Sequence, residues 1–208
     1  MKTEQKIIQG DCIEVMRGFA DKSFDLVLTD PPYGVSLGYD SFDDSKKNVR
    51  ELIEKFLPEA LRVAKTVALT PGVRGINWYP KPTWILAWIN RAGAGRSPWG
   101  FSCWQPIMVW GKDPFLAQSL GGRSDLIEDN SVGGDYAHPC PKPLSLMLKI
   151  LDRVDHNGTG TILDPFLGSG TTLVACKQLG RNGIGIEISP AYCKIAEERL
   201  SATSYPMF

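Results

Sequence analysis

A carboxylate, two prolines and an aromatic side chain follow a short apolar run, 26–28, in the segment FDLVLTDPPYG. The run leaves no room for a helix before the prolines, which indicates a buried strand ending at Asp30. Open α/β sheets bind ligands at the carboxyl ends of their strands. Pro31 and Pro32 leave carbonyl acceptors without amide donors, and Tyr33 adds a flat aromatic face. This site suits an amino group on a planar ring; the alternative is a Pro-Pro turn with an exposed Asp.

A second segment, LDPFLGSGTT at 163–172, combines a strand end with a glycine-rich turn. Gly168 and Gly170 allow the backbone to approach a ligand closely, and the N-terminus of the helix that follows favours a carboxylate or phosphate. Glu187 ends the next predicted strand, where a carboxylate can accept from both ribose hydroxyls. The alternatives are an ordinary strand–helix turn or a dinucleotide site, although the G-x-G-x-x-G fingerprint of a dinucleotide site is absent.

The elements that must position these residues alternate between strands and helices. Strands are expected at 6–10, 24–30, 66–70, 83–91, 104–110, 161–163 and 183–188. Helices are expected at 13–19, 49–64, 171–179 and 191–200, with another along the apolar stripe 144–154 that ends at Asn157-Gly158. This order predicts a mostly parallel α/β sheet flanked by helices.

Proline and loop composition add more detailed expectations. Pro58 should kink or break its helix near Leu57, and Pro106 should lie at the start of its strand or at a sheet edge. The segment 35–48 reads as a polar, flexible loop whose acids precede a helix start. The segment 116–134 is Gly- and Ser-rich and is expected to be a mobile loop. Ser189 should cap the last helix.

Bulk composition excludes several classes of protein. The 208 residues contain no run of about 18 apolar residues and no apolar leader, which predicts a soluble, cytoplasmic protein. Five scattered cysteines without a C-x-x-C pair, together with two distant histidines, argue against a disulfide framework or a metal site. Free buried thiols are expected instead.

Charge and tryptophan are concentrated in the middle of the chain although the net charge is zero. The segment 62–123 holds eight basic residues and one acid, Asp113, giving a charge of +8 − 1 = +7. All six tryptophans lie in the same segment. Such a segment predicts a phosphate-binding face and a nucleic-acid partner, the alternative being core tryptophans beside a solvated basic face.

The segment DPPY resembles the catalytic motif of the amino-group DNA methyltransferases, which methylate N6 of adenine or N4 of cytosine. LDPFLGSGTT and GIGIEIS are similar to the cofactor motifs of that family, and QGDCIEVM is similar to its Gly-Asp segment. HPCPKP resembles the family's His-Pro…Lys-Pro segment, with Cys140 and Pro141 where Thr and Gln are common. The catalytic motif comes first and the cofactor motif last, which is the order of the permuted β-type members, including small phage-type proteins.

The resemblance implies a single Rossmann-like domain spanning 1–208, with a short target-recognition region at about 74–134 inserted. It also implies S-adenosylmethionine as cofactor and double-stranded DNA as substrate. The implied catalytic residues are Asp30, Pro31, Pro32 and Tyr33. The implied cofactor-binding residues are Asp11, His138, Lys142, Asp164, Phe166, Gly168, Gly170, Thr171, Thr172 and Glu187. Within this set Asp11 would lie near the adenine, Glu187 near the ribose and Lys142 near the carboxylate, while His138 also has a purely structural interpretation.

In the implied mechanism, Asp30 and the Pro31 carbonyl accept the two hydrogens of a flipped base's amino group, and Tyr33 stacks on that base. The alternative for Tyr33 is packing against its own loop.

Asp before Pro-Pro-Tyr favours adenine within the family. The competing interpretations are N4-cytosine methylation, RNA or protein-amide methylation, and an inert DNA-binding module. The resemblance also implies a homodimer, because dimerisation is common in the resembling group. All of this requires the strand end at Asp30 and the glycine turn near Gly168 to lie side by side.

Overall fold

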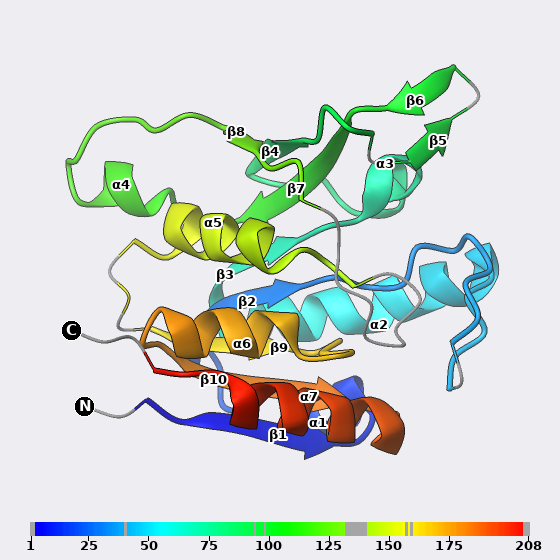
Figure 1. Ribbon diagram of the computed structural model, residues 1–208, viewed down its shortest axis with the longest axis vertical. Helices are drawn as coiled ribbons and strands as arrows, with labels where there is room; N and C mark the ends of the chain where they lie inside the picture. Colours follow the sequence, from blue (N-terminus) through cyan, green and yellow to red (C-terminus); the bar gives the residue numbers. More distant parts are fainter. Residues whose placement is uncertain are drawn as a thin grey trace.

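A mixed sheet of eight strands forms the centre of the part of the chain that the structure describes (Figure 1). This computed structural model describes residues 3–39, 41–93, 95–97, 99–131, 141–156, 158 and 160–205. The strand order is β1-β10-β9-β2-β3-β7-β4-β8. The bounds are β1 Gln5–Gln9, β2 Phe24–Thr29, β3 Ala64–Leu69, β4 Trp84–Ile89, β7 Trp104–Trp110, β8 Leu126–Glu128, β9 Thr161–Asp164 and β10 Asn182–Glu187. The first five strands in this order run parallel, whereas β7 is antiparallel to β3 and β4, so the predicted mostly parallel α/β sheet is confirmed.

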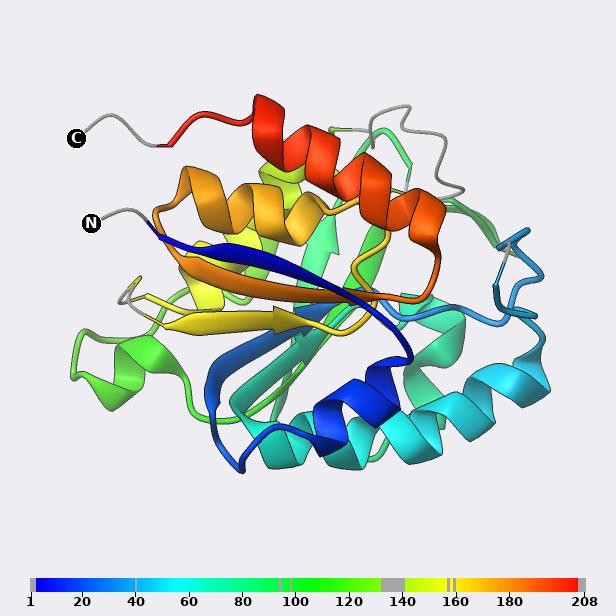
Figure 2. The same ribbon diagram turned by 90° about the horizontal axis from the view of Figure 1, so that it is seen from below.

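Helices cover both faces of the sheet, as Figure 2 shows. One face is covered by α1 (Cys12–Arg17) and α2 (Lys46–Val63), and the other by α5 (Leu144–Val154), α6 (Thr171–Gln178) and α7 (Pro190–Ala202). Two short helices, α3 (Gly72–Gly75) and η1 (Ile76–Trp78), follow β3, and α4 (Pro114–Ala117) follows β7. In the described part of the chain no helix is both long and apolar enough to span a membrane.

The apolar run of β2 explains why helices pack on both faces of the sheet. Val27 packs into the core under α1 and α2, while Leu26 and Leu28 pack into the core under α5 and α6. All three side chains are essentially buried. Successive side chains of a strand point to opposite faces, so a strand covered on both faces reads as a continuous apolar run. The run therefore fixes β2 as an interior strand between β9 and β3.

Two proline expectations have different outcomes. The helix α2 is continuous across Pro58, so the expected break near Leu57 does not occur. Pro106 lies inside β7, which is not an edge strand of the sheet. At Pro106, however, β7 has passed the end of its pairing with β3 and is paired only with β4. The missing amide of Pro106 therefore interrupts no complete three-strand ladder.

The structure adds detail to three loop expectations. The helix α5 ends at Val154, three residues before the expected Asn157, which lies outside the described residues. The segment 116–134, expected to be a mobile loop, contains the end of α4 and the edge strand β8, while its last residues, from 132, are not described. The segment 35–48, expected to be flexible, is anchored by a buried carboxylate described below.

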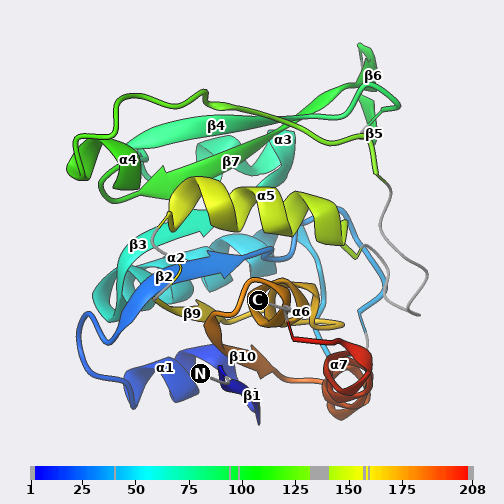
Figure 3. The ribbon, with the colours of Figure 1, turned by 60° about the vertical axis from the view of Figure 1, so that its left-hand side comes forward.

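A two-stranded antiparallel hairpin extends from the main sheet. It consists of β5 (Gly95–Ser97) and β6 (Gly100–Ser102) and lies between β4 and β7 in the chain. Figures 1 and 3 show it beyond the end of β4, on the side of the molecule to which the parallel strands point. Trp99 at its turn is 98% exposed and Phe101 is 76% exposed.

Candidate active site

The carboxyl ends of neighbouring parallel strands bring the two predicted motifs together. Asp30 follows β2 and Asp164 ends β9, and these strands are hydrogen-bonded neighbours in the sheet. Thr29 Oγ1 donates to Asp164 Oδ1 at 2.6 Å, which links the two strand ends directly. One cleft is lined by Asp30 and by the glycine turn up to Gly168. The expectation that these two segments lie side by side is therefore confirmed.

Asp30 has three side-chain partners. Its Oδ1 accepts from the hydroxyls of Tyr33 and Thr70, and its Oδ2 accepts from Lys142 Nζ at 2.7 Å. Thr70 directly follows β3, so the end of a third strand helps to orient the carboxylate. No local pattern indicated Thr70 or a Lys142–Asp30 contact, because both hydrogen bonds join residues at least 40 positions apart.

Pro32 lines the cleft, and Tyr33 is half-buried beside it. The Tyr33 hydroxyl bonds Asp30, and the Lys142 ammonium lies 4.8 Å from the centre of the Tyr33 ring. Gly34 follows with φ +67°, and a side chain there would approach the Trp78 ring to 2.9 Å. Glycine is therefore needed where the chain turns away from the motif.

A buried carboxylate, Asp44, holds the loop behind this motif. Its two oxygens accept the backbone amides of Gly34, Val35 and Leu37 at 2.7 to 3.0 Å. Three amide donors satisfy a charge that is otherwise costly to bury. The sequence predicted Asp44 only as an acid before a helix, and the helix α2 does begin two residues later, capped by Ser45.

Asp164 lies under the glycine turn and is completely buried. It accepts from Thr29 and from the backbone amide of Phe166, and a further hydrogen bond joins it to Thr172. Burial raises the pKa of Asp164 to about 6, although these hydrogen bonds act in the opposite direction. The Phe166 ring packs edge-on against Phe56 of α2, at 4.9 Å between centroids. Asp164 and Phe166 therefore fix the start of the turn from below and from one side.

The glycine turn is closed by contacts that the sequence did not reveal. Gly170 has φ +88°, and a side chain there would approach Ala196 Cβ of α7 to 2.8 Å. From the same helix, Arg199 donates to the Ser169 carbonyl at 2.6 Å and to Thr171 Oγ1 at 3.1 Å. The helix α7 thus clamps the turn at two points. No local pattern could have indicated Arg199, because its partners lie about 30 residues earlier.

Glu187 ends β10 and faces the same cleft. Its Oε2 accepts the Gly168 amide and its Oε1 accepts the Ser189 amide, both at 2.8 Å. Burial raises the pKa of Glu187, and the two backbone amides oppose that rise. Each carboxylate oxygen can accept a second hydrogen bond. Glu187 therefore holds the turn in place and keeps acceptor capacity for a ligand in the cleft.

The remaining predicted site residues have different placements. Asp11 caps α1 by accepting the amides of Ile13 and Glu14, and it lines the cleft with Thr171 and Thr172. Lys142 also lines the cleft, but its ammonium contacts Asp30 and Tyr33. His138 lies outside the described residues.

The cysteines are free in the described part of the chain. Cys12, Cys176 and Cys193 are buried, as expected, whereas Cys103 is exposed; Cys140 is not described. Cys12 lines the cleft, and burial together with the Asp11 charge raises its pKa to about 12. Its thiol therefore stays protonated near neutral pH.

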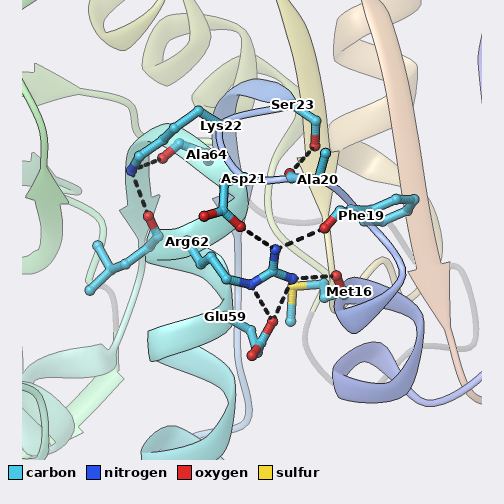
Figure 4. Close-up of polar contacts among 10 residues, drawn as sticks. Met16, Phe19, Ala20, Asp21, Lys22, Ser23, Glu59, Arg62 and Ala64 are labelled. Carbon is cyan, nitrogen blue, oxygen red and sulfur yellow. Dashed lines mark hydrogen bonds and ion pairs between the residues drawn. The ribbon is translucent and has the colours of Figure 1, made fainter.

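The basic residues of 62–123 do not form one face, which corrects the expectation of a single phosphate-binding surface. Arg62 donates to the carbonyls of Met16 and Phe19 at the end of α1 and pairs with Asp21 and Glu59 (Figure 4). This cluster lies near the start of β2, at the opposite end from Asp30.

Other basic and aromatic side chains of this segment are also divided between environments. Lys65 pairs with Asp25, again at the start of β2. By contrast, Arg74 is exposed on α3, directly after the carboxyl end of β3. Trp88 is a buried core residue, whereas Trp84 is 61% exposed. The interpretation as a core tryptophan is therefore confirmed for Trp88, while phosphate binding by the exposed residues stays a prediction.

Comparisons with known proteins agree with this geometry. A family model for N6/N4 methyltransferases, described as DNA methylase, matches residues 99–198. The Type II methyltransferase M.HpaI of Haemophilus parainfluenzae is 27% identical over 96% of this chain and 75% of its own length. The Type II methyltransferase M.HinfI of Haemophilus influenzae is 25% identical over 93% of this chain and 67% of its own length.

Solved structures show the same fold. The crystal structure of M1.HpyAVI in complex with SAM has a TM-score of 0.68 at 24% identity, covering 95% of this chain and 99% of that one. The PvuII DNA methyltransferase, described as cytosine-N4-specific, also has a TM-score of 0.68, at 16% identity, covering 95% of this chain and 87% of that one. The chain therefore has the Rossmann-like fold that these methyltransferase structures share. Over residues 99–198, and along most of its length in these relatives, the chain is similar to the N6/N4 amino-group DNA methyltransferases.

Proposed function

We propose that the protein methylates the exocyclic amine of a base flipped out of double-stranded DNA, with S-adenosylmethionine as the methyl donor. The observation that carries this proposal is the shared cleft, in which Asp30 lies beside the glycine turn that Asp164 and Glu187 support. Within the family, Asp before Pro-Pro-Tyr favours N6 of adenine over N4 of cytosine.

The residues of the cleft fit the cofactor. Glu187 is a carboxylate at the end of β10 that faces the cleft, and its acceptor capacity suits a ribose hydroxyl. Asp11 lines the cleft near Glu187, where the adenine would lie, and Phe166 and Ile188 supply apolar lining. When bound, S-adenosylmethionine supplies an electrophilic sulfonium methyl group. The protein's task is to hold an amine in line with that group.

Asp30 and the Pro31 carbonyl perform this task in the proposed reaction. An exocyclic amine is a weak nucleophile because its lone pair is delocalised into the ring. Accepting both amine hydrogens turns the lone pair out of the ring plane, toward the methyl group. The Asp30 carboxylate also stabilises the positive charge that develops on the nitrogen. Transfer of the methyl group would form the nitrogen–carbon bond as the sulfur–carbon bond breaks and would leave a neutral thioether. Asp30 would accept the proton that the methylated amine releases, while Tyr33 stacks on the base.

We also propose that residues 74–134 form the target-recognition region. The β5–β6 hairpin and α3 both lie on the side of the molecule where the parallel strands end (Figure 3). Exposed Trp99 and Phe101 and the exposed cation Arg74 supply stacking surface and positive charge there. Together these features favour a nucleic-acid substrate over a protein amide.

Replacing Asp30 tests the reaction. Asp30→Ala should lower methyl transfer to unmethylated genomic DNA by at least about a hundredfold and retain cofactor binding, because the carboxylate acts on the amine. Transfer is measured with radiolabelled S-adenosylmethionine, and mass spectrometry of the nucleosides distinguishes N6-methyladenine from N4-methylcytosine. Asp25→Asn, at the other end of β2, is the control and should keep its activity. Substantial turnover by Asp30→Ala would remove Asp30 from the mechanism.

A further inference from the structure

A buried ammonium lies against the carboxylate that is proposed to act on the amine. The side chain of Lys142 is 6% exposed, and its Nζ lies 2.7 Å from Asp30 Oδ2. The same ammonium also bonds the Tyr33 hydroxyl. Lys142 comes from the short stretch before α5, 112 residues after Asp30 in the chain. A buried ammonium requires such partners. The ion pair between Lys142 and Asp30 is therefore a specific arrangement of the site.

In that state Asp30 is poorly available to a substrate. A carboxylate has about four acceptor positions, and the hydroxyls of Tyr33 and Thr70 and the Lys142 ammonium use three of them. The ammonium also neutralises the negative charge that the proposed reaction needs beside the developing cation. The arrangement therefore describes a resting site in which Asp30 is masked.

The same lysine can serve a second anion. Lys142 lines the cleft together with Gly168, Thr171 and Glu187, the residues that would surround the cofactor. Its flexible four-carbon stem lets the ammonium move between partners within one cleft. Resting on the proposed function, we propose that Lys142 is a positioning residue that pairs with Asp30 in the free enzyme. It transfers to the carboxylate of the bound cofactor, which releases Asp30 for the target amine.

This exchange predicts a specific thermodynamic coupling. Asp30 and the carboxylate of the ligand compete for one ammonium, so removing the charge of Asp30 should strengthen ligand binding. Because coupling is reciprocal, cofactor binding should in turn make Asp30 more available to the base. A purely structural ion pair predicts the opposite result. Breaking such a pair would loosen the cleft and lower its affinity for the ligand.

The test measures binding by calorimetry and needs no turnover. The ligands are S-adenosylhomocysteine and its analogue without the carboxylate, each titrated into the wild type, Asp30→Asn, Lys142→Met and the double variant. Asp30→Asn should bind S-adenosylhomocysteine about fivefold more tightly than the wild type does. Lys142→Met should bind it about tenfold more weakly or worse. Both effects should vanish for the analogue, and the gain from Asp30→Asn should vanish in the Lys142→Met background.

Two control variants separate the exchange from general loss of charge. Lys149→Met removes an ammonium that pairs with Asp129 on the outer side of α5, and Asp25→Asn removes a carboxylate at the far end of β2. Neither should change the affinity for either ligand. If Lys142→Met does not fold, as judged by circular dichroism, Asp30→Asn alone still tests the proposal with the two ligands.

Three outcomes decide the matter. Tighter binding by Asp30→Asn that depends on the ligand carboxylate supports the exchange. Equal or weaker binding by Asp30→Asn, or an equal gain with both ligands, overturns it while leaving the proposed function intact. A wild-type protein that binds neither ligand would reject the proposed function itself, and the exchange with it.

Discussion

Asp164 combines complete burial with a carboxyl group whose pKa is raised to about 6. Its usual value is 3.8, so the folded protein holds a proton there that the unfolded chain has released between these two pH values. Stability from this group is therefore greatest below about pH 4 and is lost as the pH rises toward 6. The shift of about two units corresponds to a loss on the order of 3 kcal/mol.

Replacing Asp164 by Asn should remove this dependence. Asn keeps the shape and an acceptor for the Phe166 amide, but it carries no charge to desolvate. Between pH 4 and 6.5 the wild type should lose the stability that comes from Asp164, whereas Asp164→Asn should not. The free energy of unfolding of the variant should therefore rise relative to that of the wild type over this range. Urea unfolding at four pH values measures it. A difference that does not change over this range would show that Asp164 is ionised without cost in the folded protein.

At the scale of residues, the sequence predicted side chains that belong to local motifs and missed their partners. Asp30 and Glu187 could be identified because each lies at the carboxyl end of a readable strand. Thr70 and Arg199 could not, because each contacts its partner through the tertiary fold and neither lies in a distinctive pattern. Asp44 was recognised as an acid, but only the folded loop shows that it accepts three amides.

At the scale of elements, α7 packs so closely against the glycine turn that position 170 has no room for a side chain. A methyl group at Gly170 would adopt an unfavourable φ of +88° and would also meet Ala196 Cβ at 2.8 Å. The strained φ costs about 1 to 2 kcal/mol and the overpacking about 1 to 3 kcal/mol more. Gly170→Ala should therefore lower the free energy of unfolding by about 2 to 5 kcal/mol and weaken cofactor binding.

Gly93 offers a matched control for that substitution. Its φ is +102°, but an added Cβ would have no neighbour within 4 Å among the described residues beyond its own chain neighbours. Gly93→Ala should show the cost of the φ angle alone and leave cofactor binding unchanged. Both variants are compared by denaturant unfolding and by titration with S-adenosylhomocysteine. If the two substitutions have equal effects, the contact between the turn and α7 does not constrain Gly170.

Element positions were predicted well where periodicity or apolar runs were long. The strand β7 was located at its observed bounds, and the capping of α7 by Ser189 was also predicted. The strand β8 was missed because it has three residues, of which only Ile127 is buried. The break expected near Pro58 does not occur, because buried side chains along α2 hold the helix together across one missing amide: Val49, Ile53, Phe56, Leu57, Ala60 and Val63.

At the scale of the whole molecule, the two ends of the parallel strands have different roles. The carboxyl ends carry the cleft, α3 and the side from which the β5–β6 hairpin extends. The amino ends carry ion pairs such as Arg62 with Asp21 and Glu59, and Lys65 with Asp25. The net charge of zero hides this division, and so does the charge of the segment 62–123, because both sums combine residues from opposite ends.

This division predicts which cations contact DNA. Each phosphate contact that is lost should lower the slope of log affinity against log salt by about one. Arg74→Ala removes an exposed cation on α3, directly after the carboxyl end of β3, and should reduce that slope for a random-sequence duplex. Arg62→Ala should leave the slope unchanged but lower the melting temperature, because Arg62 satisfies the carbonyls at the end of α1 (Figure 4). Fluorescence anisotropy at five salt concentrations and thermal unfolding measure the two effects. An equal loss of slope in both variants would mean that DNA contacts both ends of the sheet, and the proposed recognition region would then have to be redrawn around Arg62.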